Sequence, residues 1–376
     1  MLNYLSSKPE NSKGRLIIEP ENPGNRSSFE RDRDRIIHST AFRKLKQKTQ
    51  VFIESESDYY RTRLTHTLEV SQITRSICRL LGLNEDLGEC IALAHDLGHP
   101  PFGHSGENAL NFKMKNYGGF NHNIQTFRII TELEKKYIEF NGLNLTWESL
   151  EGIIKHNGNF INSIPDELLS YNKRHNLELS KNPSLEAQVA AICDDIAYNN
   201  HDIDDAIRAN LISMDELNEI DYFNNIISSI YNKYNKVEDT LLINEVIRIS
   251  IDLMVKDISL NTRENTLKFS IKSLNDIKNY PNFLVTMSDK FFDYGNEIKK
   301  FLYKNVYNNI ELENKRKKSE IKIIKLFDYF IDNFETLPDD WKNKKNFMSK
   351  ERIICDYIAG MTDRYATYQF NLLNEK

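Results

Sequence analysis

Apolar side chains recur every three or four positions along most of this 376-residue chain, with polar and charged residues between them. That spacing is typical of helices that bury one face. Signals that favour strands are confined to short stretches near Val51-Phe52 and Phe283–Val285. The pattern therefore predicts an all-α fold.

Two predicted helices are joined at Gly82, which is typical of a helix end. The first begins near His66, and the second has Asn84 as its N-cap and ends at a Gly- and Pro-rich loop after His95-Asp96. Antiparallel helices joined by so short a turn place the start of the first level with the end of the second. His66 is therefore predicted to lie near the His95-Asp96 pair.

A third predicted helix has Asn182 as its N-cap and runs to Arg208. Asp194, Tyr198 and Asp202 follow one another at four-residue steps, so they line one side of it. An exposed acidic face is the alternative explanation for these acids. It is the preferred explanation for Asp195, Asp204 and Asp205.

The rest of the chain suggests three parts. Residues 1–28 are rich in Ser, Asn, Pro and Gly and predict a loosely ordered arm. Residues 29–210 carry most of the motifs and are predicted to form one domain. Residues 211–376 predict a helical region packed on that domain, and the basic run Lys315–Lys318 within it is interpreted as a solvated helix face.

Composition narrows the class of protein. Hydrophobic residues make up 40% of the chain and charged residues 28%, which is ordinary for a soluble globular protein. The net charge of -5 argues against a protein dominated by nucleic-acid binding. No apolar run is long enough to span a membrane, no secretory signal is visible, and the four cysteines are scattered as expected for reduced core thiols. These features favour a cytoplasmic protein without a membrane partner.

The densest chemistry lies between residues 59 and 108, which hold four of the nine histidines. Imidazole and carboxylate groups are the usual protein ligands for a divalent metal that supports hydrolysis. A lone His-Asp pair is common, and a buried histidine more often forms hydrogen bonds than binds metal. Here His66, the His95-Asp96 pair and two histidines of a Gly- and Pro-rich loop occur together, which favours a metal site.

Basic residues near this window are candidates for binding phosphate. Arg43, Lys44, Lys46 and Lys48 form a local cluster. A solvated helix face explains most of them, and a polyphosphate substrate would use one or two. Arg63 lies three residues before His66 and hence on the same helix face. Its guanidinium suits phosphate oxygens, and a surface arginine is the alternative.

Six motifs occur in one order along the chain. They are Arg31-Asp-Arg-Asp-Arg-Ile-Ile-His38, Tyr59-Tyr-Arg-Thr-Arg-Leu-Thr-His66, His95-Asp-Leu-Gly-His-Pro-Pro-Phe-Gly-His104, Lys155-His-Asn-Gly158, Asp194-Asp-Ile-Ala-Tyr198 and Gly360-Met-Thr-Asp-Arg-Tyr-Ala366. In these residues the chain resembles the HD-domain superfamily and, more closely, the bacterial deoxyguanosinetriphosphate triphosphohydrolase-like family. The resemblance is weakest over residues 210–350. It implies an HD-domain helical fold with a helical C-terminal extension, in which residues 29–210 form the catalytic HD domain.

The resemblance also implies roles for individual residues. The implied ligands of a divalent metal ion, Mg, Mn or another transition metal, are His66, His95, Asp96 and Asp194. The implied catalytic residues are His104, Glu107 and His122. The implied substrate contacts are Gln50, Arg63, Lys155, Tyr198 and Asp202. Among these, Tyr198 is expected to pack against the 2′ position of the sugar and thereby to exclude ribose.

The activity implied by the resemblance is that of a metal-dependent triphosphohydrolase, which cleaves a deoxynucleoside triphosphate (dNTP) to a deoxynucleoside and inorganic triphosphate. In this scheme a metal-activated water attacks the α-phosphorus, and His104, positioned by Glu107, transfers a proton. The implied partners are the dNTP, a nucleotide activator, and further copies of the chain in a hexamer or another homo-oligomer.

Two alternatives stay open. One is an HD phosphohydrolase that acts on a nucleoside monophosphate, a cyclic nucleotide or a guanosine alarmone, against which the Asp194–Tyr198 motif counts. The other is a non-catalytic sensor of nucleotides or single-stranded DNA that uses the basic cluster at residues 43–48. A purely structural metal site has no need of His104, Glu107 and His122 around an open position, and this counts against the sensor.

Overall fold

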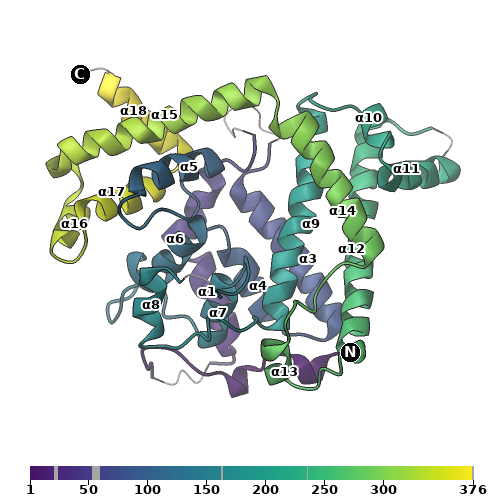
Figure 1. Ribbon diagram of the computed structural model, residues 1–376, viewed down its shortest axis with the longest axis horizontal. Coiled ribbons are helices and arrows are strands. Elements are labelled where there is room, and N and C mark those ends of the chain that lie inside the picture. Colours follow the sequence, from purple (N-terminus) through teal and green to yellow (C-terminus); the bar gives the residue numbers. More distant parts are fainter. Residues whose placement is uncertain (21–23, 53–59, 162–163, 235, 375–376) are drawn as a thin grey trace.

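The computed structural model describes residues 1–20, 24–52, 60–161, 164–234 and 236–374, so Tyr59 of the second motif lies outside the described residues. The described chain is built of helices, joined by three isolated backbone bridges and no sheet (Figure 1). The prediction of an all-α fold is confirmed. The predicted strand pairs near Val51 and Phe283 are wrong, because both stretches are irregular.

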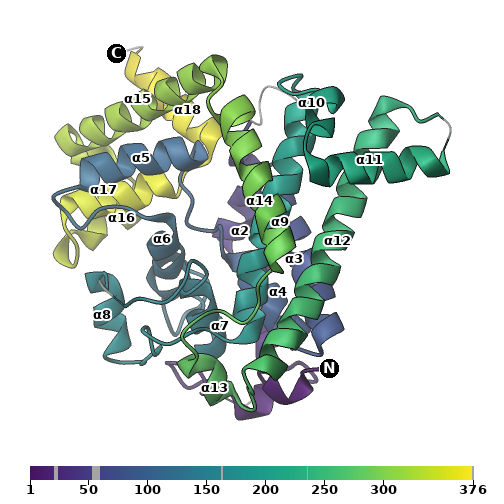
Figure 2. The ribbon, with the colours of Figure 1, turned by 45° about the vertical axis from the view of Figure 1, so that its right-hand side comes forward.

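Three helices form the centre of the molecule: α3 (Arg63–Leu81), α4 (Glu85–Ala94) and α9 (Leu185–Arg208) pack on one another. Long α12 (Asp239–Lys268) and α14 (Asp289–Leu302) cover α9 on its outer side (Figure 2). Helix α3 turns Val70, Ile73 and Ile77 inward, where each is almost fully buried. Burying one such side chain stabilises the fold by about 1.5–3 kcal/mol.

The turn between α3 and α4 follows the predicted chemistry. Gly82 ends α3 with φ +78°, a left-handed conformation that favours glycine. A Cβ atom at this position would also lie 1.9 Å from Asn3 Oδ1. Asn84 caps α4 by accepting a hydrogen bond from the backbone N–H of Leu87. The predicted hairpin and its N-cap are therefore confirmed.

The start of α9 differs from its prediction by two residues. Ser184, not Asn182, is the N-cap, since its hydroxyl accepts a hydrogen bond from the backbone N–H of Ala187. The amide of Asn182 instead donates to the backbone carbonyls of Tyr280 and Asn282. A contact distant in sequence therefore overrides the local capping preference.

A second apolar core lies at the C-terminal end of the chain. It joins α5 (Gly103–Met114) to α15 (Ile310–Asp332), α17 (Lys350–Ala359) and α18 (Asp363–Asn374). Figure 1 shows α15 lying along α5, and α17 packs against both of these helices. Helix α5 directly follows the histidine-rich loop and packs in this C-terminal core. The core therefore holds the end of the loop in place. The boundary at residue 210 stays a prediction.

The N-terminal arm differs from the expectation of a loose segment. Leu2 and Leu5 are buried in the main core, and Ser7 donates to the carboxylate of Glu186 through both its backbone N–H and its hydroxyl. The same carboxylate accepts a hydrogen bond from the backbone N–H of Asn84. One buried acid thus fastens the arm to the start of α4.

The remaining elements are short or peripheral. The other α-helices are α1 (Ser28–Ile37), α2 (Thr40–Lys44), α6 (His122–Arg128), α7 (Trp147–Ile154), α8 (Asp166–Asn172), α10 (Met214–Asn218), α11 (Asp221–Lys233), α13 (Leu274–Asn279) and α16 (Asp339–Lys342). The 3₁₀ and π segments are η1 (Asn3–Leu5), η2 (Pro9–Asn11), η3 (Leu45–Gln47), η5 (Ile129–Leu133), η6 (Tyr303–Tyr307), η7 (Phe334–Thr336) and η8 (Asn343–Asn346). None of the helices in the described part of the chain has the length and apolar character that a bilayer crossing requires.

Candidate metal centre and active site

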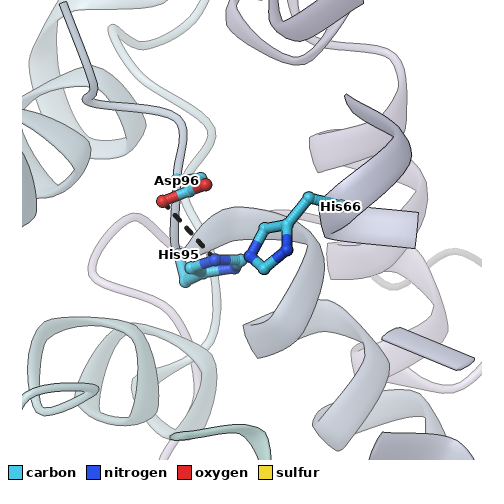
Figure 3. A group of neighbouring side chains, drawn as sticks. All are labelled: His66, His95 and Asp96. Carbon is cyan, nitrogen blue, oxygen red and sulfur yellow. Dashed lines mark ion pairs between the residues drawn. The ribbon is translucent and has the colours of Figure 1, made fainter. Parts of the chain in front are cut away.

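The structure brings the four predicted metal ligands together from three helices. His66 lies in the first turn of α3, His95 and Asp96 follow the end of α4, and Asp194 lies within α9. His66 Nε2 is 2.8 Å from Asp194 Oδ1. His95 Nε2 is 3.6 Å from the same oxygen and 3.4 Å from Asp96 Oδ1. Figure 3 shows His66, His95 and Asp96 meeting at one point.

The hydrogen bonding of His95 leaves its Nε2 atom free to bind a cation. Its Nδ1 donates to the carbonyl of Ala92 over 2.6 Å, which places the lone pair of the neutral ring on Nε2. This Nε2 atom is buried and has no hydrogen-bond partner among the described residues. A buried nitrogen without a partner is costly, and a metal ion would satisfy it.

Electrostatics favour positive charge at the same point. Burial alone would raise the pKa of Asp96, but the neighbouring His95 and Arg63 hold it well below its usual range. Burial lowers the pKa of His95, and the charges of Asp96 and Asp194 more than offset this and raise it. The centre therefore attracts a positive charge, which a proton or a metal cation can supply. Two imidazoles and two carboxylates fit a divalent cation.

His156 is a fifth group at this centre, and the sequence analysis gave it no role. Its Nε2 lies 3.3 Å from Asp194 Oδ2, and its ring stacks on that of His95 with centroids 5.0 Å apart. His156, His95 and Asp194 could hold a metal ion together. His156 belongs to the Lys155-His-Asn-Gly158 motif, in which Lys155 was the predicted substrate contact.

Lys155 itself points away from the centre. Its ammonium group is fully buried, 2.7 Å from Glu151 Oε1, and donates to the carbonyl of Glu178 over 2.8 Å. Burial lowers its pKa, and Glu151 partly offsets this effect. The expected phosphate contact is therefore not supported, because the charge of Lys155 is already neutralised within the core.

The predicted catalytic residues form a second cluster beside the metal ligands. Glu107 accepts hydrogen bonds from His104 Nδ1 at 3.2 Å and His122 Nδ1 at 2.9 Å. Burial would raise the pKa of Glu107, but these two imidazoles lower it strongly, so it stays a carboxylate. The side chain of His104 is 63% exposed, whereas those of His122 and Glu107 are mostly covered. Only His104 of the three therefore presents its ring to solvent.

His99 connects the two clusters, and it is a further residue that received no role from the sequence. Its Nε2 lies 3.2 Å from Asp96 Oδ1, and its ring stacks on His122 with centroids 3.9 Å apart. Burial, followed by the charges of Arg63 and His122, holds the pKa of His99 well below its usual range. A neutral imidazole therefore lies between the metal ligands and the Glu107 cluster.

Arg63 lies at the junction of these groups. Its Nη1 donates to Asp96 Oδ2 over 2.8 Å, and the side chain is only 2% exposed. Gly103 packs against the other end of the guanidinium, since a Cβ atom at that glycine would lie 2.9 Å from Arg63 Nη2. Glycine is also favoured there by a φ of +56°.

A cavity of about 270 Å³ opens beside His104. The predicted substrate contacts Gln50 and Tyr198 line it, and the side-chain oxygen of Gln50 is buried without a hydrogen-bond partner in the described chain. Asp202 lies next to the lining and accepts a hydrogen bond from Tyr307. Burial raises the pKa of Asp202 to about 7.

The C-terminal region supplies one wall of this cavity, and no motif in the sequence points to these residues. The wall includes Tyr303, Tyr307, Lys315, Arg316 and Glu320. The prediction of a solvated helix face at Lys315–Lys318 therefore holds for Lys317 but not for Arg316. Arg316 turns inward and donates to the carbonyl of Tyr307 over 2.8 Å, while Lys317 stays exposed beside Glu313. A run of four basic residues shows no periodicity, so the sequence alone could not separate them.

Comparisons with known proteins identify two domain families in the chain. Residues 63–199 match the HD domain, and residues 285–371 match the phosphohydrolase-associated domain. The fold, the clustered histidines and aspartates, and these two matches define an HD-domain phosphohydrolase.

Relatives that match along nearly the whole chain identify the family more closely. The chain is 47% identical to a protein of Rickettsia prowazekii, with 99% of this chain and 98% of the relative covered. It is 45% identical to a protein of Bartonella henselae (98% and 94% covered) and 44% identical to one of Brucella canis (99% and 95%). All three are called deoxyguanosinetriphosphate triphosphohydrolase-like proteins. The chain belongs to this family, as its motifs predicted.

Proposed function

We propose that the chain is a metal-dependent dNTP triphosphohydrolase, which releases a deoxynucleoside and inorganic triphosphate. The observation that carries the proposal is the position of His104, which is bonded to Glu107 beside the metal ligands and also lines the cavity with Tyr198. The names of the relatives support the same reaction.

His66, His95, Asp96 and Asp194 would hold the cation. When bound there, a divalent cation supplies Lewis acidity to a phosphate oxygen and to the attacking water. The electron-rich donors explain why the site selects a cation, and His156 is positioned to join them.

Side chains of the protein supply the proton that the leaving group needs. Water adds to the α-phosphorus and the bond from that phosphorus to the 5′ oxygen breaks, so the departing 5′ oxygen needs a proton. His104, whose ring lines the cavity, is the residue placed to donate this proton, and ionised Glu107 orients that ring. His122 also donates a hydrogen bond to Glu107, and its ring stacks on His99, which in turn contacts Asp96.

The remaining contacts divide between sugar and phosphate. We assign the sugar to Tyr198 and Asp202, with Tyr307 behind them, because these residues lie one and two helical turns beyond Asp194 on α9. Gln50 offers an unused amide oxygen at the cavity. Arg63 keeps donors beyond the one given to Asp96, and these suit phosphate oxygens.

Product analysis tests the proposal. Purified protein is incubated with each dNTP and with Mg, Mn or another divalent metal, and the anions released are separated by ion chromatography. We expect inorganic triphosphate and the deoxynucleoside in equal amounts, and little turnover of the ribonucleotides. Release of phosphate or pyrophosphate instead would reject triphosphohydrolysis and favour another HD phosphohydrolase reaction. The homo-oligomer, with a hexamer among its forms, and the cytoplasmic location stay predictions.

A further inference from the structure

The turn from α17 into α18 carries the motif Gly360–Ala366, which has no role in the proposed reaction. This turn meets two other stretches of chain, and both of them lead to residues of the catalytic cavity. Lys48 is buried and donates to the carbonyls of His99 and Ala359, so it joins all three stretches. Segments far apart in sequence therefore meet at one buried junction.

Asp363 provides the second link at this junction, and it uses both oxygens of its carboxylate. Its Oδ1 atom accepts a hydrogen bond from the backbone N–H of Phe102, and its Oδ2 atom accepts one from that of Thr49, each over 2.9 Å. The side chain of Asp363 is buried. Gln50 directly follows Thr49, and His104 comes two residues after Phe102. One carboxylate thus holds the backbone that leads to two residues of the cavity lining.

The backbone that Asp363 holds is strained. Phe102 has φ +64° and ψ +23°, a left-handed conformation that is unfavourable for a bulky side chain and persists only where the surroundings hold it. Gly103 follows with φ +56°, and a Cβ atom there would lie 3.4 Å from the carbonyl oxygen of Thr49. His104 is the second residue of α5, so this turn sets the direction in which its ring points.

We propose that Asp363 is a positioning residue of the active site, which holds the left-handed turn before α5 and thereby aims His104 at the cavity. Asp363 is not part of the cavity lining and acts through the backbone. The inference rests on the proposed function in taking His104 as the group that transfers a proton. A displacement of a reacting group by about 1 Å can lower a rate about a hundredfold.

Steady-state kinetics of the full-length protein with its metal test this role. In Asp363→Ala we expect kcat to fall about a hundredfold and KM to change much less, because the reacting group is displaced while the other contacts to substrate stay. Asp363→Asn keeps one oxygen that can accept a hydrogen bond, so we expect a fall of about tenfold. If Asp363→Ala does not fold, Asp363→Asn serves in the same comparisons. Wild-type kcat in the folded variant would overturn the proposal.

A double-mutant cycle with His104 separates positioning from a general weakening of the fold. If Asp363 acts through His104, adding Asp363→Ala to His104→Ala lowers kcat less than about threefold further. A purely structural role would leave the two effects independent, and they would multiply. A further hundredfold loss in the double variant would therefore overturn the proposal.

Asp257 offers a matched control, because it binds the N-cap of α14 as Asp363 binds the N-cap of α5. Its carboxylate accepts hydrogen bonds from the backbone N–H of Ser288 over 2.9 Å and from the hydroxyl of the same residue over 2.6 Å. Asp257 does not line the catalytic cavity. Asp257→Ala therefore loses contacts of the same kind, and we expect it to keep the wild-type kcat.

Hydrogen exchange measured by mass spectrometry tests the turn without any turnover. We expect residues 99–108 to exchange about tenfold faster or more in Asp363→Ala, and at the wild-type rate in Asp257→Ala, with equal metal content in both. Wild-type exchange over these residues in Asp363→Ala would overturn the proposal. Release of an anion other than triphosphate would reject the proposed function instead, since the exchange rates and the ratio of the variant rates for that anion still decide the positioning.

Discussion

The two regions that meet at the cavity beside His104 contribute different kinds of side chain to it. The HD domain, residues 63–199, supplies buried imidazoles and carboxylates that lie within hydrogen-bonding distance of one another. The C-terminal region supplies the aromatic and basic wall opposite, from Tyr303 to Glu320. The proposed reacting groups of the first region lie in short motifs, while the residues that the second region adds to the cavity belong to no motif. A search for motifs therefore finds the proposed reacting groups and misses about half of the cavity lining.

The largest expected effect comes from the metal ligands. His95→Ala removes the buried nitrogen that faces the centre, and we expect activity to fall below about one thousandth of the wild-type value. Metal content per chain, measured after dialysis, falls with it. His175→Ala, a histidine outside the centre that contacts Tyr171, is the matched control and keeps both. Full metal content with full activity in His95→Ala would reject the centre.

His104→Ala tests the catalytic cluster separately from the metal. The exposed ring is lost while every metal ligand stays, so turnover falls about a hundredfold or more and metal content does not change. If kcat stays at the wild-type value, His104 is not the acid.

His156→Ala tests whether the fifth group belongs to the centre. The ring contacts Asp194 through the carboxylate oxygen that does not face His66. Removing such a neighbour of a metal ligand lowers metal affinity by about ten- to a hundredfold. Competition with a fluorescent chelator measures the affinity, and His156→Gln is expected to restore part of it. An unchanged affinity in His156→Ala would leave His156 a packing residue.

Arg316→Ala and Lys317→Ala compare two neighbours of the C-terminal wall. Arg316 lines the cavity and Lys317 is exposed beside Glu313. We expect KM to rise about tenfold in Arg316→Ala, with little change in kcat, and no change in Lys317→Ala. Equal effects of the two substitutions would mean that the C-terminal region forms a scaffold without a contact to substrate.

Tyr307→Phe has the smallest expected effect, about 1 kcal/mol in the free energy of unfolding, because one hydrogen bond is lost. Burial raises the pKa of Asp202 to about 7, so its contribution to stability is complete below pH 4 and is lost as the pH rises through 7. The hydroxyl of Tyr307 lowers this pKa, and its removal raises it further. Denaturant titrations between pH 5 and 9 are expected to show a larger loss above pH 7 than below it. A loss that is the same at every pH would contradict this account.

Much of the architecture and of the metal centre could be predicted from local patterns. The turn at Gly82 and the cap at Asn84 follow from backbone chemistry, and they bring His66 level with His95. The four-residue steps from Asp194 to Asp202 describe one side of α9. Helical periodicity and short turns constrain neighbours in sequence, so these inferences needed no knowledge of distant contacts.

Other features depended on contacts that no local pattern carries. Lys155 and His156 are adjacent, and only packing turned the lysine into the core and the histidine to Asp194. Likewise Arg316 reaches the cavity and Lys317 does not, because packing on α5 fixes the rotation of α15 about its own axis and turns Arg316 toward the cavity. The sequence by itself determined the helices and the types of reacting groups, since these depend on neighbours along the chain. Only the tertiary structure decided which side chains share the cavity, since that depends on how helices far apart in sequence pack.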